Sequence, residues 1–283
     1  MRTEKIRRSP AKTAGSVMRY LYAVILVIFC VFPFLWMLST SFKESQDIFS
    51  APPKFITEHM TLENYINAVE KNNLLVYAKN SLIVTVTTVV LTILIATLAA
   101  FGMGYLKLKG TKFFTKLLYA LQMLPVVTSI VPLYIICGKL GLLNTHWSLI
   151  LTYLGSAVPV AVILITGFFS DIPSEIGEAA MIDGCNVFQT FYKVILPLAV
   201  PGIVSGAIYT FIRIWQEFII ALSFTSEKLM YTLPIGLKAY EGSNQTDWGG
   251  LMATAVVISV PAIIMFVLVQ KQFVDSMAGS VKG

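Results

Sequence analysis

Two full charges interrupt an apolar segment in the last third of the chain. Arg213 and Glu217 lie four residues apart within residues 198–222, and Trp215 and Gln216 stand between them. Ionisable side chains are costly inside a membrane, so they pair with one another or face a watery cavity. Two interpretations follow and both stay open here. The charges form an ion pair that holds helices together, or the four residues line a path for a polar solute.

Motifs for enzymatic chemistry are absent from the sequence. No G-x4-G-K-[ST] run is present to hold nucleotide phosphates, and no G-x-S-x-G elbow occurs. His59 and His146 are the only histidines, and neither belongs to an H-E-x-x-H zinc motif. We therefore expect no catalytic residue, no metal site and no bound cofactor in this chain.

The composition is that of a membrane protein. Of the 283 residues 56% are apolar and 13% are charged, and the mean hydropathy is +0.76. This is about half the charge of an ordinary soluble domain. Six apolar stretches are long enough to cross a bilayer, which takes about 20 helical residues. The predicted spans lie near 18–39, 82–103, 117–138, 148–169, 198–222 and 251–270.

These spans predict an all-α polytopic membrane protein whose transmembrane domain covers residues 18–270. The first span is longer than the apolar region of a signal peptide, and no small-x-small cleavage site follows it. We expect it to remain as an anchor. The three cysteines are odd in number and two lie in apolar spans, which favours buried thiols over a disulfide framework.

Lys and Arg are distributed unequally between the two sides of the predicted membrane domain. If the N-terminus is cytoplasmic, the inner segments hold 13 of the 21 basic residues and the outer segments hold 7. The positive-inside rule therefore places both terminal tails, 1–17 and 271–283, in the cytoplasm. Membrane topology thus explains the net charge of +6 better than a nucleic-acid surface does, because the basic residues form no periodic stripe.

The predicted cytoplasmic loop 170–197 has helix signals of its own. Pro173 suits the first turn of a helix, Glu175 and Glu178 favour its positive N-terminal end, and Gly184 is placed to end it in the left-handed conformation. The loop therefore predicts a helix-turn-helix at the membrane face.

A second short helix is predicted to follow. Asn186 can cap it, and we expect it to run to Ile195 and end at Pro197. The first helix carries three acids and no base. A helix resting on lipid headgroups favours Lys and Arg, so this composition indicates docking to a protein.

The same loop carries the pattern EAA-x3-G-x9-[IV]-x-LP, which resembles the coupling loop of membrane subunits of ATP-binding-cassette (ABC) importers. The resemblance assigns ATPase coupling to Glu178, Ala179, Ala180, Asp183, Gly184, Leu196 and Pro197. Other segments resemble the carbohydrate-uptake branch, on the side of the maltose-type second permease. These segments are Asp171-Ile172-Pro173, Trp215-Gln216-Glu217-Phe218, Thr232-Leu233-Pro234, Thr246-Asp247-Trp248-Gly249 and Val281-Lys282-Gly283.

The resemblance implies a permease subunit of a binding-protein-dependent importer for a carbohydrate, with an oligosaccharide as the expected substrate. It implies four kinds of partner: a homologous second permease in a heterodimer, two cytosolic ABC ATPases that carry ATP and Mg, an extracytoplasmic solute-binding protein, and the sugar. The expected location is the plasma membrane of a bacterium or archaeon. Alternatives are an ABC permease for glycerol-phosphate or another polar solute, and a secondary transporter that uses Arg213 and Glu217 in ion coupling.

The predicted exterior loop 224–250 contains Tyr240, Gly242, Ser243, Asn244 and Gln245. In the maltose-type family, a loop at this position reaches into the sugar cleft of the binding protein. Aromatic and amide side chains suit that contact, although an ordinary solvated loop has a similar composition. The binding-protein contact is therefore the interpretation that the resemblance favours.

The topology predicts that loop 170–197 and loop 224–250 lie on opposite sides of the membrane. Single cysteines at Ser174 and Asn244, placed in a background without the three native cysteines, should react with an impermeant thiol reagent from opposite sides. Labelling of both positions from the same side would contradict the topology.

Overall fold

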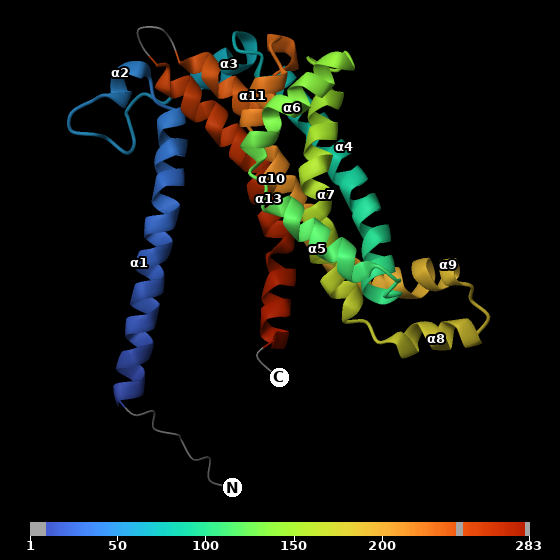
Figure 1. Cartoon of the computed structure of the whole chain (residues 1–283). Coiled ribbons are helices and arrows are strands. Elements are labelled where there is room, and N and C mark those ends of the chain that lie inside the picture. Colours follow the sequence, from blue (N-terminus) through green and yellow to red (C-terminus); the bar gives the residue numbers. More distant parts are fainter. Residues whose placement is uncertain (1–9, 242–245, 281–283) are drawn as a thin grey trace. The chain divides into compact units, whose positions relative to one another are not determined.

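The computed structural model describes residues 10–241 and 246–280 (Figure 1). Within these residues the chain is helical and contains no β-strand, which confirms the all-α class. The chain forms two compact units. Of the described residues, unit 1 comprises 10–68, 240–241 and 246–256, and unit 2 comprises 69–239 and 257–280.

Unit 1 contains α1 (Pro10–Ser41), α2 (Ser45–Ile48), most of α3 (Glu63–Glu70) and the start of α13 (Trp248–Ser280). Unit 2 contains α4 (Leu74–Ala100), η1 (Phe101–Tyr105), α5 (Thr111–Gln122), α6 (Val126–Lys139), α7 (His146–Ser170), α8 (Ser174–Ile182), α9 (Val187–Thr190), η2 (Phe191–Ile195), α10 (Leu196–Trp215), α11 (Ile219–Phe224), η3 (Lys228–Met230), α12 (Leu233–Gly236) and the rest of α13. The short element η4 (Leu237–Tyr240) lies at the boundary in the sequence.

Five helical segments in the described part of the chain are long and apolar enough to cross a membrane. They are Met18–Ser41, Leu74–Tyr105, His146–Ser170, Val187–Trp215 and Trp248–Leu268. The count becomes six if the bent pair α5 and α6 forms one span.

The third predicted span, 117–138, is not one straight helix. The chain breaks between α5 and α6, and the two helices meet at 95°. Pro125 explains the break, because it lacks a backbone N–H and its ring disfavours helical geometry at Leu124. Pro125 itself is extended, with φ −61° and ψ 128°, and α6 starts directly after it.

The fifth predicted span, 198–222, is also interrupted. α10 ends at Trp215 and α11 starts at Ile219. The expected stop at Pro197 was wrong, since α9, η2 and α10 form one continuous helical run through that residue. Pro197 is the second residue of α10 and follows a π-helical turn in which the backbone pairing is already displaced. The proline lies just after this π-helical turn, where the regular α-helical hydrogen bonding is already interrupted.

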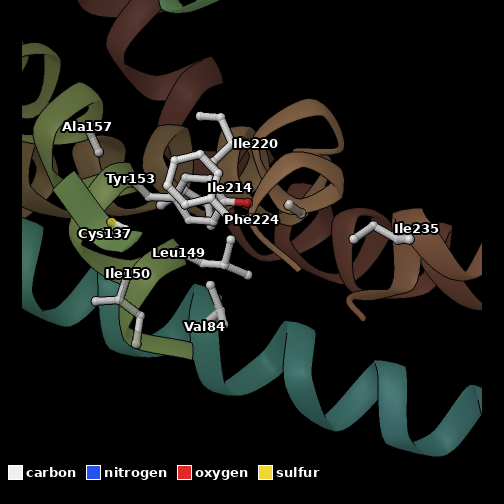
Figure 2. Packing of buried hydrophobic residues seen from close by; sticks show 11 residues of the cluster. Val84, Cys137, Leu149, Ile150, Tyr153, Ala157, Ile214, Ile220, Phe224 and Ile235 are labelled. Carbon is white, nitrogen blue, oxygen red and sulfur yellow. The ribbon is translucent and has the colours of Figure 1, made fainter. Parts of the chain in front are cut away.

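Helices α4, α7 and α10 form the centre of unit 2. Figure 2 shows one buried cluster there, in which Tyr153 of α7 lies close to Ile214 of α10 and Phe224 of α11. Leu149 and Val84 extend this cluster to α4. Association of helices in lipid depends on close van der Waals packing rather than on the hydrophobic effect, so the fit of these side chains matters.

Glycines allow α10 to lie close to α7. A Cβ atom on Gly202 would lie 2.3 Å from the ring of Phe168, and one on Gly206 would lie 3.0 Å from Ile165. Several buried hydroxyls in the helices bond to the backbone carbonyl one turn earlier, as those of Thr88, Thr152 and Thr210 do at 2.7 to 2.8 Å. Such bonds satisfy a hydroxyl where no water is present.

One end of unit 2 is held together by Asn80 of α4. Its Nδ2 donates to the carbonyls of Leu229 and Tyr231 at 2.8 and 2.9 Å, and its Oδ1 lies 3.0 Å from Nε2 of His146. The side chain is buried. At the opposite ends of α4 and α7, η1 contacts the start of α8 (Figure 1). The segments 101–105 and 171–195 therefore lie at the same end of unit 2.

In unit 1, residues 43–65 fold against the end of α1. Nζ of Lys43 donates to the carbonyl of Lys54 at 2.6 Å and lies 4.6 Å from the centre of the Trp36 ring. Burial lowers the pKa of Lys43 from its ordinary value, and the carboxylate of Asp47 opposes that shift. Asn64 donates to the carbonyls of Ser41 and Lys43, both at 2.9 Å.

The Asn80 contacts generate a stability prediction. Asn80→Ala leaves two backbone carbonyls without their donor in a buried place, which should destabilise unit 2 by about 2–4 kcal/mol. The measurement is the thermal unfolding midpoint of the detergent-solubilised protein. Lys79→Ala, at an exposed neighbouring position of the same helix, is the control. Equal midpoints for the two variants would contradict the assigned role of Asn80.

Candidate coupling element and translocation cavity

The turn after α8 depends on Gly184. The residue has φ +90°, in the left-handed region, as the sequence predicted. The N–H of Cys185 donates to the carbonyl of Ala180 at 3.0 Å, and the N–H of Gly184 donates to that of Met181 at 3.1 Å. This pair of bonds is a Schellman motif, which satisfies the last carbonyls of the helix.

Asn186 starts the next helix, as predicted. Its side chain accepts from the N–H of Gln189 at 2.8 Å, and the Gln189 side chain accepts from the N–H of Asn186 at 3.0 Å. This reciprocal capping box fixes the direction in which α9 leaves the turn. The tight turn and the cap together hold α8 at a defined angle to α9.

Tyr105 attaches α8 to the end of α4. Its hydroxyl donates to the carbonyl of Ser174 at 3.2 Å. The ring lies over Gly177, where a Cβ atom would come within 2.0 Å of the hydroxyl oxygen. Gly177 is therefore required by close approach, because its φ is ordinary and only its missing side chain makes the contact possible.

An aromatic cluster lies behind this contact. The ring centre of Phe101 is 4.6 Å from that of Phe191, 5.6 Å from that of Tyr105 and 6.0 Å from that of Phe169. These four rings come from η1, η2 and α7. The cluster connects α8 and α9 to the three central helices of unit 2 through dense packing.

The predicted coupling residues divide into an outer and an inner set. Ala180 is buried and faces inward, with 7% of its surface exposed. Leu196 is partly buried. The outer set consists of Glu178, Ala179, Asp183, Gly184 and Pro197, all exposed.

Sequence reasoning did not single out the apolar side chains exposed beside this outer set. Ile182 is 86% exposed and Phe188 is 69% exposed, and Met181 and Val187 are exposed near them. The signal was present in the sequence as apolar residues on both sides of the glycine turn. Exposed apolar side chains that lie close together favour contact with another protein or with a membrane surface.

Glu217 stabilises the break between α10 and α11. Its Oε1 accepts from the N–H of Ile220 at 2.8 Å, and its Oε2 accepts from the N–H of Ala221 at 3.0 Å and from the hydroxyl of Tyr153 at 2.6 Å. The carboxylate thus caps the N-terminus of α11. Within the described residues it forms no ion pair with Arg213, so the ion-pair interpretation was wrong.

The other predicted path residues are separated from one another. Trp215 is 2% exposed, is stacked on Phe211, and donates through Nε1 to the carbonyl of Ile258 at 2.9 Å. Gln216 is exposed at the end of α10. Arg213 points elsewhere and donates from Nη1 to the hydroxyl of Tyr209 at 3.5 Å.

Arg213 lines a cavity of about 360 Å³ that opens beside the bend between α5 and α6. Of the four predicted path residues, Arg213 alone lines it. The polar lining also includes Gln122, Ser129, Thr152 and Ser156. Sequence reasoning had not assigned these four to the path. The available signal was that Thr152, Gly155 and Ser156 share one face of an apolar helix.

The predicted binding-protein loop is described only in part. Tyr240 is 3% exposed, and its hydroxyl accepts a hydrogen bond from Thr254 at 2.6 Å. It therefore supports the base of the loop from inside unit 1. Gly242, Ser243, Asn244 and Gln245 lie outside the described residues.

A family model described as the binding-protein-dependent transport system inner membrane component matches residues 92–279. The chain belongs to this family. Its members are membrane permease subunits of ABC importers, and the ATPase of these importers is a separate subunit. Family membership and the several apolar helices together show that this chain is a multi-pass protein of the plasma membrane. Membership in this family favours the interpretation of the chain as a subunit of an ATP-driven importer over its interpretation as a secondary transporter.

Curated relatives match over nearly the whole chain. The ABC transporter permease protein YurM of Bacillus subtilis is 39% identical, over 95% of this chain and 89% of that protein. The sulfoquinovosyl glycerol permease SmoH of Agrobacterium fabrum is 36% identical, over 95% of both. The trehalose/maltose permease MalG of Thermococcus litoralis is 33% identical, over 92% of this chain and 95% of that protein.

A solved structure shares the fold. A chain of a bacterial ABC transporter involved in the import of the acidic polysaccharide alginate superposes with a TM-score of 0.81. It covers 93% of this permease and 98% of its own length, at 18% identity. This likeness supports the arrangement of helices in the permease and carries no information on its substrate.

The contact between Tyr105 and Gly177 predicts a paired effect of mutation. Gly177→Ala should displace α8 from η1 and reduce transport strongly, because the added Cβ overlaps the tyrosine hydroxyl. Adding Tyr105→Phe removes the overlapping oxygen and should restore part of the transport. Uptake by the assembled importer in liposomes is the measurement. Gly167→Ala, whose Cβ would meet nothing within 4 Å, is the control. Full uptake by Gly177→Ala alone would contradict the contact.

Proposed function

We propose that this permease forms a heterodimer with a homologous permease and imports a carbohydrate, in particular an oligosaccharide, delivered by an extracytoplasmic binding protein. Two cytosolic ABC ATPases supply the energy. The observation that carries the proposal is the α8–α9 element, whose shape and surface suit docking to a soluble protein. Both chain termini lie in the cytoplasm in this proposal.

The substrate class is supported by the relatives. Those named for their substrate are permeases for sulfoquinovosyl glycerol, diacetylchitobiose, and trehalose or maltose. All three are glycosides or sugars. Identities of 33 to 36% over at least 92% of this chain support transfer of the class, and not of the individual sugar.

The surface of α8 and α9 supports contact with the ATPase. Exposed Ile182 and Phe188 offer apolar side chains to a groove, while Glu175, Glu178 and Asp183 surround them with negative charge. Burying the apolar side chains favours association by about 25 cal/mol per Å² of apolar surface. A matching groove needs an apolar floor and a basic rim.

Movement of α8 would reach the membrane through two attachments. Tyr105 ties the N-terminal half of α8 to η1 and α4, and the covalent run through α9 and η2 continues into α10. Both attachments meet in the aromatic cluster around Phe101. Closure of the ATPases around ATP would therefore rotate α4 and α10 together and switch the cavity from inward-facing to outward-facing access.

The coupling role predicts different effects for two substitutions at Gly184. Gly184→Val forces a β-branched residue into φ +90°, which costs about 1–2 kcal/mol and should tilt α9. Gly184→Asn is the control, because asparagine adopts this conformation more readily. In liposomes with all partners, the Val variant should lose the ATP hydrolysis that loaded binding protein stimulates, and the Asn variant should keep most of it.

Glu178→Lys tests docking at the same element. The substitution reverses an exposed charge at the proposed contact, so the ATPase should be lost during purification. Affinity of the binding protein for its sugar should not change in any of these variants. Full sugar-stimulated hydrolysis and uptake by both Gly184→Val and Glu178→Lys would refute the coupling assignment.

A further inference from the structure

We propose that the substrate carries an anionic group, such as a carboxylate, sulfonate or phosphate, and that Arg213 binds this group in the cavity beside the α5–α6 bend. The inference deepens the proposed function by naming the chemical class of the carbohydrate, and it rests on that function only for the sugar part of the substrate. Its basis is a cation inside the membrane domain that has no counter-charge among the described residues and that lines a cavity.

The charge of Arg213 is not neutralised within the described residues. The carboxylate of Glu217, four residues away, is already used by Tyr153 and by the N–H groups of Ile220 and Ala221. The guanidinium donates a single long hydrogen bond, to the hydroxyl of Tyr209 at 3.5 Å. Four of its five N–H donors are therefore available in the described part of the chain. A guanidinium does not deprotonate in proteins, so the positive charge persists.

The cavity offers space for a substrate group at this position. Its volume of about 360 Å³ lies within the range of small-molecule sites. Among the described residues that line it, Arg213 alone is charged. Gln122 and Ser129 come from the two sides of the bend, and Thr152 and Ser156 come from α7. These uncharged polar groups suit sugar hydroxyls, while the guanidinium stands apart as the group that distinguishes acidic from neutral ligands.

An anionic ligand fits this arrangement better than a neutral one. An unpaired charge in a membrane span is costly, and that cost is relieved when a bound anion takes the place of the missing acid. Arginine binds carboxylate, sulfonate or phosphate oxygens through two parallel hydrogen bonds, which a single hydroxyl does not match. Because the counter-charge belongs to the substrate and not to the protein, Arg213 is again unpaired after the substrate has left and can bind the next one.

The first test compares acidic sugars with their neutral counterparts. Cells with and without this permease, each containing the other importer components, are given α-1,4-digalacturonate with α-1,4-digalactose, and trehalose 6-phosphate with trehalose. sn-Glycerol 3-phosphate is added as an acidic compound that is not a sugar. Mass spectrometry of the medium measures the depletion that depends on the permease.

The outcomes separate the inference from the proposed function. Depletion of an acidic sugar in preference to its neutral counterpart supports both. Depletion of neutral sugars alone overturns the role of Arg213 and leaves carbohydrate import standing. Depletion of sn-glycerol 3-phosphate alone keeps the anion site and overturns the carbohydrate assignment.

The second test assigns the preference to Arg213. Arg213→Gln should reduce the uptake rate of the acidic compound on the order of tenfold to hundredfold at low concentration, the loss expected for a charge-assisted pair. Arg213→Lys should keep part of that uptake, because the charge remains while the two-pronged geometry is lost. Lys116→Gln removes an exposed cation of α5 outside the cavity and should leave uptake unchanged.

A structural role for Arg213 would give a different result. If Arg213→Gln no longer co-purifies with the second permease, or slows acidic and neutral compounds equally, the guanidinium serves assembly and the proposal is overturned. Co-purification and uptake are therefore measured on the same preparations.

Discussion

Every helix break inside a bilayer must find its hydrogen-bond partners within the protein, because hydrocarbon supplies none. The break between α10 and α11 meets this requirement through one side chain, Glu217. Its two oxygens accept from two backbone N–H groups and from Tyr153. These hydrogen bonds hold α11 against α7, and Ile220 of α11 lines the same cavity as Arg213. The carboxylate is thereby committed to the backbone, and Arg213 has no counter-charge from its own helix.

The opposite end of unit 2 depends on close contact rather than on charge. Gly177 lies under Tyr105, and two π-helical turns bring Phe101 and Phe191 together. Packed interiors transmit displacement because they contain little free volume. The α8–α9 element is consequently attached to α4 and α10 at two points.

The cavity and the coupling element share the same helices. α7 contributes Thr152 and Ser156 to the cavity and Phe169 to the aromatic cluster. α10 contributes Arg213 at one end and continues from the coupling loop at the other. The same helices therefore position both the cavity and the α8–α9 element, although no residue of that element lines the cavity.

The sequence by itself determined the membrane class, the approximate helices, the glycine turn at Gly184 and the cap at Asn186. These features depend on local periodicity and on conformations that few residues adopt, so a linear pattern carries them. Tertiary structure alone decided the partners of Arg213 and Glu217 and the need for Gly177. The spacing of four residues was compatible with an ion pair, but the Glu217 carboxylate instead accepts hydrogen bonds from the N–H groups of Ile220 and Ala221 at the helix break. Which donor a carboxylate pairs with depends on the groups that folding brings within hydrogen-bond distance of it. The spacing of residues along the sequence does not give that distance.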